Sequence, residues 1–206
     1  MKQRPNDELF HFLDKAASFV MANLLWVLLS IPLVTLPAAT AGLFATMSLW
    51  AQGKPTEVFQ DFFRGAWQHW RKASLVVVFD ILLGGLVILN FALFRLMNIS
   101  QPVLLLSQSI TLFVAVTLIM VNLYLWPLMV SFEDFSLRRL VDTSLRLVFI
   151  HPAWSLAMLV LAIIPFALSI FLPAAALVLV SFSTFALMVS WAAWRVIRHY
   201  SPEAGV

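Results

Sequence analysis

The stretch SIPLVTLPAATAGL (Ser30–Leu43) decides how this chain folds, because it lies inside a long charge-free run and contains two prolines. The run extends from Ala16 to Gly53, and Pro32 and Pro37 interrupt it. A transmembrane helix needs about 20 apolar residues to cross a hydrocarbon core about 30 Å thick. The run can therefore cross a membrane once, or twice if the second crossing is short, and the topology of the whole chain depends on which occurs.

The composition of the chain is that of an integral membrane protein. Of its 206 residues, 62% are hydrophobic and only 11% are charged, whereas soluble domains carry about 25% charged residues. We therefore expect a single transmembrane domain over residues 1–206, with the lipid bilayer as a partner. The absence of cysteine excludes disulfides and thiol nucleophiles, and no basic run is dense enough to indicate nucleic-acid binding.

Apolar runs predict an all-α polytopic bundle of six spans, at residues 16–36, 38–51, 74–97, 103–132, 153–172 and 174–194. Pro173 separates the last two spans. The second span is short, at roughly 14 residues or about 21 Å. It is rich in small residues, which let helices approach closely: Ala38, Ala39, Ala41, Gly42 and Ala45.

The positive-inside rule favours two crossings by the charge-free run. If residues 38–51 cross, twelve of the thirteen basic residues fall on one side, and only Arg95 lies at the other end. If they do not cross, Lys2, Arg4 and Lys15 are stranded outside. We therefore expect a multi-pass protein with both termini in the cytoplasm, and a helical hairpin whose outer turn lies near Pro32 and Pro37.

Two segments between the spans predict cytoplasmic amphipathic helices, at residues 56–72 and 136–149. Their apolar residues recur at helical spacing, and the two apolar stripes align at an offset of 78 residues. This offset suggests two parallel span–amphipathic–span units. Each helix either anchors the chain at the inner leaflet or docks a partner. The candidate interaction face consists of Arg64, Gln68, Arg71, Arg138, Asp142 and Arg146.

One carboxylate lies well inside a predicted span. Asp80 is about seven residues, or roughly 10 Å, from the cytoplasmic end of its helix, where ionisable groups are costly and by default functional candidates. Gly84, one turn further on, opens a notch on the same face. Asn23 and Asn122 fall at similar depth in other spans. These three polar residues could form an intramembrane layer, which either serves transport or only ties helices together.

Sequence motifs give no support for catalysis. The four histidines, His11, His69, His151 and His199, are scattered over predicted cytoplasmic segments without metal-ligand spacing. No phosphate loop, Gly-x-Ser-x-Gly motif or Cys/His pair is present. We therefore expect no enzymatic activity, no cofactor and no metal site.

The N-terminal third of the chain resembles the YesL-like family of bacterial membrane proteins, a domain of unknown function. The resemblance covers roughly residues 13–86. It rests on a first helix with Asn23-Leu24-Leu25-Trp26, a turn with Val34-Thr35, and an amphipathic segment with Phe62-Phe63-Arg64. Leu36-Pro37 stands where the family has Gly-Pro. The resemblance implies a bacterial inner-membrane location and, because such proteins are often encoded beside carbohydrate-uptake systems, an accessory role.

Three functions are compatible with these features. The first is a non-enzymatic accessory or interaction protein, associated with membrane transport components such as those for carbohydrate uptake. The second is a small solute transporter or channel that works through Asp80. The third, a membrane enzyme, lacks motifs. Few buried charges favour the first function, whereas Asp80, Asn23 and Asn122 favour the second. The sequence does not specify an oligomeric state.

Overall fold

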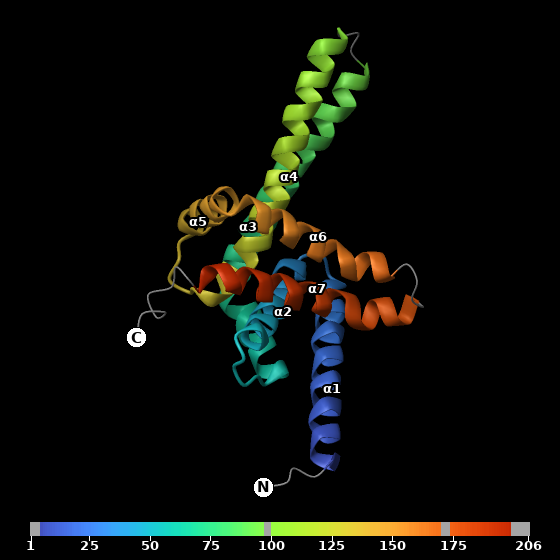
Figure 1. Ribbon diagram of the computed structural model, residues 1–206, viewed down its shortest axis with the longest axis vertical. Coiled ribbons are helices and arrows are strands. Elements are labelled where there is room, and N and C mark those ends of the chain that lie inside the picture. Colours follow the sequence, from blue (N-terminus) through green and yellow to red (C-terminus); the bar gives the residue numbers. More distant parts are fainter. Residues whose placement is uncertain (1–4, 97–99, 170–173, 199–206) are drawn as a thin grey trace.

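The computed structural model describes residues 5–96, 100–169 and 174–198, and the regular structure of this part of the chain is entirely helical (Figure 1). The predicted all-α class is confirmed. The seven helices are α1 (Pro5–Ser30), α2 (Leu36–Ala51), α3 (Val58–Leu96), α4 (Gln101–Ser131), α5 (Leu137–Ile150), α6 (Pro152–Ser169) and α7 (Ala174–Ile197).

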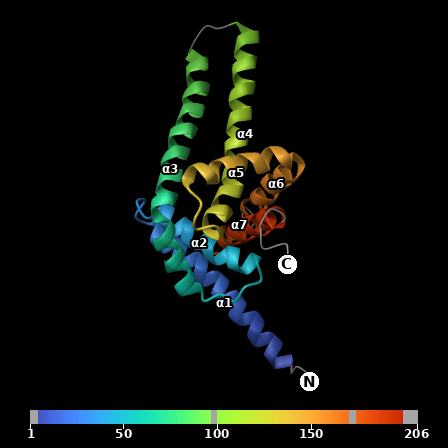
Figure 2. The ribbon, with the colours of Figure 1, turned by 90° about the vertical axis from the view of Figure 1, so that its left-hand side faces the viewer.

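The helices do not all share one direction. Helices α3 and α4 lie side by side as a long hairpin that projects from one end of the molecule, and α1 projects from the other end (Figure 1, Figure 2). Helices α6 and α7 lie next to each other and cross the direction of α3 and α4. The arrangement is therefore a helical hairpin mounted on a crossed base, rather than a simple parallel bundle.

The turn between α1 and α2 is the one that the two prolines predict. Helix α1 ends at Ser30 and α2 begins at Leu36. The hydroxyl of Thr35 donates a hydrogen bond of 2.7 Å to the carbonyl oxygen of Pro32. Pro37 lies in the first turn of α2, where its missing N–H leaves no helical hydrogen bond unmade. The predicted helical hairpin is thus present, with α1 extended towards the N-terminus as far as Pro5.

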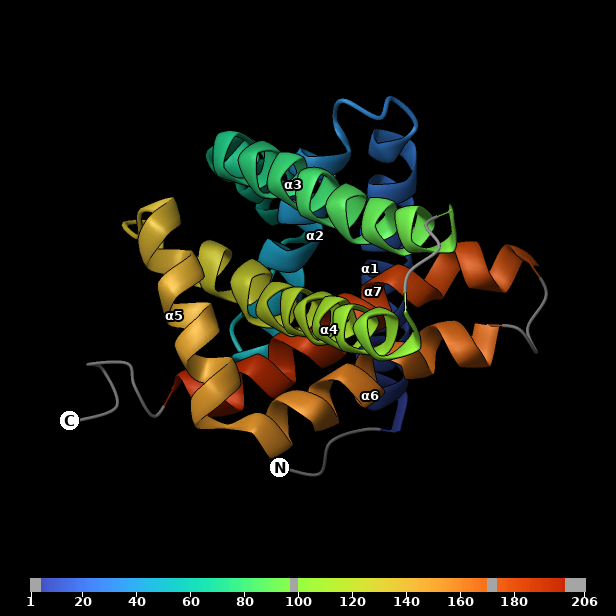
Figure 3. The ribbon, with the colours of Figure 1, turned by 90° about the horizontal axis from the view of Figure 1, so that it is seen from above.

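Helix α2 lies at the centre of the base, where it contacts α1, α3, α4 and α7 (Figure 3). Its contact with α3 depends on glycine. A Cβ added to Gly42 would lie 2.6 Å from the Phe62 carbonyl oxygen, and one added to Gly65 would lie 2.3 Å from the Ala45 Cβ. The small residues of α2 therefore permit a close approach, but they meet the charged first part of α3 rather than its apolar part.

Helix α3 corrects one sequence-based expectation. The sequence predicts a separate interfacial helix at residues 56–72 before a span at residues 74–97, but one continuous helix of 39 residues, Val58–Leu96, runs through the junction between them. The junction, Arg71-Lys72-Ala73-Ser74, contains neither glycine nor proline, so nothing interrupts the helix there. The apolar segment of α3, defined here as Ala73–Leu93, therefore continues directly from its polar first part.

The second amphipathic segment behaves differently. Helix α5 ends at Ile150 and α6 begins at Pro152, with a bend of 104° between them. Proline at the start of α6 explains the break, because it suits a helix N-terminus but cannot continue a preceding helix. The two amphipathic segments are thus not equivalent, and the predicted pair of parallel structural repeats is wrong in its geometry.

Three helices of the described chain are long and apolar enough to cross a membrane: α3, α4 and the Val180–Ile197 part of α7. A fourth span results if the bent pair α5–α6 is counted as one. Helices α1 (from Lys15) and α2 are shorter apolar helices. Length and composition thus support three to four spans. The predicted turn at Pro173 lies outside the described residues.

Candidate functional site

The two helices of the long hairpin are joined by the carboxylate that the sequence singled out. Asn122 Nδ2, on α4, donates a hydrogen bond of 2.8 Å to Asp80 Oδ1, on α3. The same Nδ2 also donates to the Leu118 carbonyl oxygen at 3.1 Å. Both side chains are half-buried. The structure therefore brings together two of the three residues of the proposed polar layer.

A second polar contact joins the same helices further along the hairpin. Thr111 Oγ1, on α4, donates to Asn90 Oδ1, on α3, at 3.0 Å. Asn90 lies ten residues beyond Asp80, about 15 Å along the helix. The sequence analysis missed this pair. An antiparallel pairing that joins Asp80 to Asn122 also places Asn90 opposite Thr111, so the register could have revealed it.

Asn23 lies elsewhere. It is fully buried where α1 meets α7, and its Oδ1 accepts hydrogen bonds from the backbone N and the hydroxyl of Ser183, at 2.9 and 3.2 Å. Trp26 stacks on Phe182 beside it, with ring centroids 4.0 Å apart. Depth along a helix could be read from sequence, but the direction in which α1 faces could not. Asn23 therefore holds α1 against α7.

Two largely apolar cavities flank the Asp80–Asn122 pair. One, of about 550 Å³, lies between the α3–α4 hairpin and α5, and Arg138 and Asp142 also line it. The other, of about 560 Å³, lies on the side of α2, α6 and α7, and Thr40 also lines it. Two sets of predicted residues, the intramembrane pair and the α5 face, thus meet at one cavity.

The remaining charged side chains of the candidate interaction face are exposed. Arg64 pairs with Asp61 at 3.6 Å, and Arg146 pairs with Asp142 at 2.9 Å. The guanidinium of Arg71 lies 5.2 Å from the centre of the Trp70 ring. All three contacts join residues of one helix. These charges therefore do not hold the helices of the fold together.

The exposed side of α3 beside these charges carries four aromatic side chains, which we call the aromatic strip: Phe59, Phe63, Trp67 and Trp70. Their exposed fractions are 58%, 40%, 81% and 45%. The opposite side of the same helix is buried, with Phe62 and His69 at 0% and 3%. The predicted apolar stripe of this segment is thus divided between a face packed in the base and an unpartnered face.

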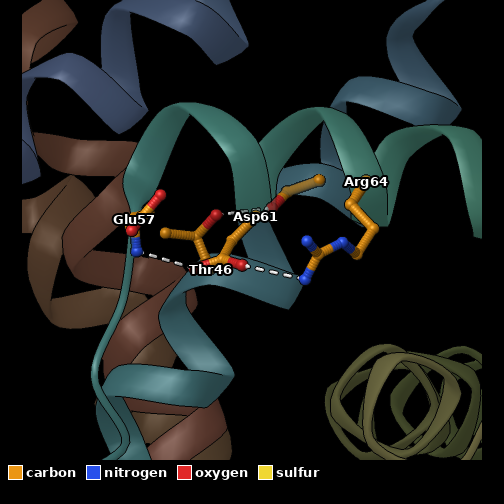
Figure 4. A network of polar contacts seen from close by, with 5 residues as sticks. Thr46, Glu57, Asp61 and Arg64 are labelled. Carbon is orange, nitrogen blue, oxygen red and sulfur yellow. Dashed lines mark hydrogen bonds and ion pairs between the residues drawn. The ribbon is translucent and has the colours of Figure 1, made fainter.

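The N-terminus of α3 carries a polar network that borders a separate cavity (Figure 4). The carboxylate of Asp61 accepts a hydrogen bond of 2.8 Å from the backbone N of Glu57 through Oδ2 and faces Arg64 through Oδ1. A carboxylate at this position also suits the positive end of the helix dipole. Thr46 of α2 lies beside it and donates to the Gly42 carbonyl oxygen at 3.1 Å.

This cavity, which we call the polar cavity, has a volume of about 250 Å³ and lies between α2, α3 and α4. Its lining includes Lys54, Arg64, Gln68, His69 and Glu133. His69 is 3% exposed, and its Nδ1 is buried without a hydrogen-bond partner in the described part of the chain. Such unpaired buried atoms are uncommon. The sequence does not predict this cavity, because the spacing of the four histidines does not show which of them is buried.

No group of three or more His, Asp or Glu side chains in the described ranges 5–96, 100–169 and 174–198 is placed to hold a metal ion. The polar cavity offers hydrogen-bond donors and acceptors, with positively and negatively charged side chains among them. The two apolar cavities share the Asp80 carboxylate and the Asn122 amide, and the cavity beside α5 also has Arg138 and Asp142 in its lining.

Comparison with known proteins finds one family match. Residues 19–91 match the model of the family described as "Protein of unknown function, DUF624". The matched segment covers the C-terminal part of α1, all of α2 and most of α3, and so includes the α2–α3 contact, the aromatic strip and Asp80. No curated protein and no solved structure matches the chain. This part of the chain, which is less than half of it, is therefore similar to a family of proteins whose function is unknown.

Proposed function

We propose that the protein is a non-enzymatic accessory protein of the membrane, which docks another membrane protein through the polar first part of α3. The observation that carries this proposal is the continuity of α3 across the end of its apolar segment. The resemblance to proteins encoded beside uptake systems makes a component of a solute transporter, such as one for carbohydrates, the first partner to test.

The length of α3 supports an aqueous position for the aromatic strip. A helix of 39 residues is about 58 Å long, whereas the hydrocarbon core is about 30 Å thick. The apolar segment Ala73–Leu93 alone accounts for about 31 Å. A helix that lies flat in the headgroup layer must bend before it enters the membrane, as α5 and α6 do. Helix α3 is unbroken, so residues 58–72 extend beyond the hydrocarbon.

The exposed side chains of the aromatic strip are of the types that favour contact with another protein over contact with water. Exposed Trp67 and Trp70, with Arg71 stacked on Trp70, are the residue types that dominate binding energy in protein interfaces. Contiguous apolar surface on a soluble face marks an interaction site. Arg64 and Arg71 border the strip, so the complementary partner face is apolar with acidic side chains at its edge.

Photocrosslinking tests this assignment. A photoreactive amino acid at Trp67 should form one discrete adduct with a second membrane protein in native membranes, and the crosslinked partner peptide should carry acidic residues. Arg64→Glu together with Arg71→Glu should abolish that adduct. The matched control is the same probe at Leu106, an exposed apolar residue of α4, which should react with lipid. Reaction of position 67 with lipid alone, or with a second copy of the chain, would overturn the proposal.

For the topology we propose six spans with both termini in the cytoplasm of a bacterial cell, in its inner membrane. The distribution of basic residues supports it. Helix α2 has 16 residues, or about 24 Å. Its Gly42 and Ala45 lie against Phe62 and Gly65 of α3, so a crossing by α2 and an aqueous position for residues 58–72 exclude each other, and the two are tested separately.

A second candidate function is transport of a small amphipathic solute through Asp80. The two cavities of about 550 and 560 Å³ on either side of the Asp80–Asn122 pair favour it, because a cavity lined by apolar groups with a few convergent polar groups is the usual form of a small-molecule site. Asp80→Asn should abolish solute flux if this is the function, while the charge reversals on α3 should leave flux unchanged. If the protein is an accessory protein instead, Asp80→Asn should leave solute flux unchanged, and the charge reversals on α3 should reduce it.

A further inference from the structure

The polar cavity between α2, α3 and α4 contains a buried group that the fold itself does not use. His69 Nδ1 is shielded from solvent and has no hydrogen-bond partner in the described chain. A neutral imidazole has one donor nitrogen and one acceptor nitrogen, and leaving either one unpaired in a buried position costs free energy. A ligand in the cavity would recover that cost by pairing with Nδ1 once the imidazole turns, because Nδ1 itself is shielded from the cavity in this conformation.

The rim of the cavity carries one free charge of each sign. Among the described residues, no ion pair engages the ammonium of Lys54 or the carboxylate of Glu133. Asp61, by contrast, is already satisfied by the Glu57 backbone N and by Arg64. The unused groups are thus the Lys54 ammonium and the Gln68 amide on one hand, and the Glu133 carboxylate with an imidazole nitrogen on the other. The Lys72 ammonium beside them already donates to the Glu133 backbone carbonyl at 2.6 Å.

We propose that the polar cavity binds a zwitterionic group in which an ammonium is joined to a phosphate. The phosphate would lie by Lys54, with Arg64 and Gln68 as further donors. The ammonium would donate to the Glu133 carboxylate and, once the imidazole turns, to His69 Nδ1. The volume of about 250 Å³ is below the range of about 300–1,000 Å³ typical of drug-sized ligands, so a headgroup-sized molecule fits.

The position of the cavity makes a phospholipid headgroup the expected source of this group. His69 precedes the apolar segment of α3 by four residues, about 6 Å. Each headgroup layer extends about 5–8 Å beyond the hydrocarbon core. The imidazole of His69 is therefore at headgroup depth when residues 73–93 span the core. The proposal uses this placement of α3 but does not depend on the identity of any protein partner.

The test uses the purified full-length chain in detergent and counts bound lipid by native mass spectrometry. Phosphatidylethanolamine should bind about tenfold more tightly than phosphatidylcholine, whose quaternary ammonium cannot donate hydrogen bonds, and than phosphatidylglycerol, which has no ammonium. Displacement by soluble phosphoethanolamine would assign the free zwitterion as a sufficient ligand, and its failure to compete would assign the lipid. Equal binding of the three lipids would overturn the proposal.

Two exposed rim residues keep the test independent of folding. Lys54→Gln and Glu133→Gln should each weaken phosphatidylethanolamine binding by about tenfold, since each removes one charge-assisted hydrogen bond. The matched controls are Lys15→Gln on α1 and Asp134→Asn, which neighbours Glu133 but does not line the cavity. Both controls should bind as the unmodified chain does. Loss of binding in the controls to the same extent, or retention in both rim variants, would contradict the site.

Discussion

Asn122 on α4 donates a 2.8 Å hydrogen bond to the carboxylate of Asp80 on α3. This contact gives Asp80 a structural role, because it joins the two helices of the projecting hairpin within their apolar parts. Hydrogen bonds between membrane helices contribute about 0.6 kcal/mol on average and up to about 1.7. The pair therefore contributes only a small free energy to the contact between α3 and α4. Substitutions of Asp80 separate this structural role from a role in transport.

Asp80→Asn should leave the free energy of unfolding within about 0.5 kcal/mol of its original value, because the amide oxygen of asparagine can still accept from Asn122 Nδ2. Asp80→Leu removes the acceptor and should cost about 1 kcal/mol. Unfolding in mixed detergent micelles measures both changes. A double-mutant cycle with Asn122→Leu provides the control, since the coupling should vanish once either partner is gone.

Thr111→Val should weaken the second contact of the hairpin. The substitution removes the hydroxyl that donates to Asn90 Oδ1 and should cost about 0.6–1.7 kcal/mol. The two contacts are about 15 Å apart along α3, so Thr111→Val and Asp80→Leu should add in their effects on unfolding. Strong non-additivity would mean that the two helices separate as one cooperative unit.

Gly65→Ala should destabilise the base of the protein. The added Cβ would lie 2.3 Å from the Ala45 Cβ, and overpacking costs about 1–3 kcal/mol, which exceeds the gain of up to about 1 kcal/mol in helix propensity. Thermal unfolding in detergent measures the loss. Ala45→Gly in the same chain should restore much of the stability, because it removes the clashing atom.

Gly84→Ala and Gly85→Ala are the matched controls for that substitution. Both glycines lie in the same helix, but no atom lies within 4 Å of an added Cβ at either position. Each should leave stability unchanged or raise it by up to about 1 kcal/mol. If all three glycine substitutions destabilise equally, the close α2–α3 approach is not the cause.

The six-span topology predicts a labelling pattern. Single cysteines at Gln52, Gln68 and Ser136 should be shielded from an impermeant thiol reagent in intact cells, whereas a cysteine at Ser100 should react. In opened membranes the reagent reaches both surfaces, so all four cysteines should react. A cysteine that still does not react there is buried in the protein and gives no information on topology. Labelling of Gln52 in intact cells would place the loop after α2 outside and would reject the second crossing.

The sequence predicted the helical class and the hairpin at Pro32 and Pro37 well, because apolar runs and prolines act locally. The prediction of two separate helices in place of α3 was wrong. The composition changes from amphipathic to apolar at Lys72, and such a change looks like the boundary between two elements. Helix continuity there depends on the absence of a breaker, whereas Pro152 supplies one after α5.

The candidate site was only partly predictable. The depth of Asp80, Asn122 and Asn23 could be counted from helix ends, and two of them meet. Which face of α1 is turned towards α7 depends on how the two helices pack. A single sequence therefore could not predict the contact between Asn23 and Ser183. The polar cavity around His69 combines residues of three helices and two loops, and no local pattern marks it.

The claim that the polar first part of α3 lies outside the hydrocarbon core is tested most directly by depth measurement with spin labels. Labels at Trp67 and at Leu82, an exposed residue of the apolar segment, are compared in nanodiscs by their accessibility to a water-soluble nickel reagent and to oxygen, which partitions into lipid. The account predicts that nickel dominates at position 67 and oxygen at position 82. Oxygen dominance at both positions would place the aromatic strip in lipid and would contradict a docking surface on α3.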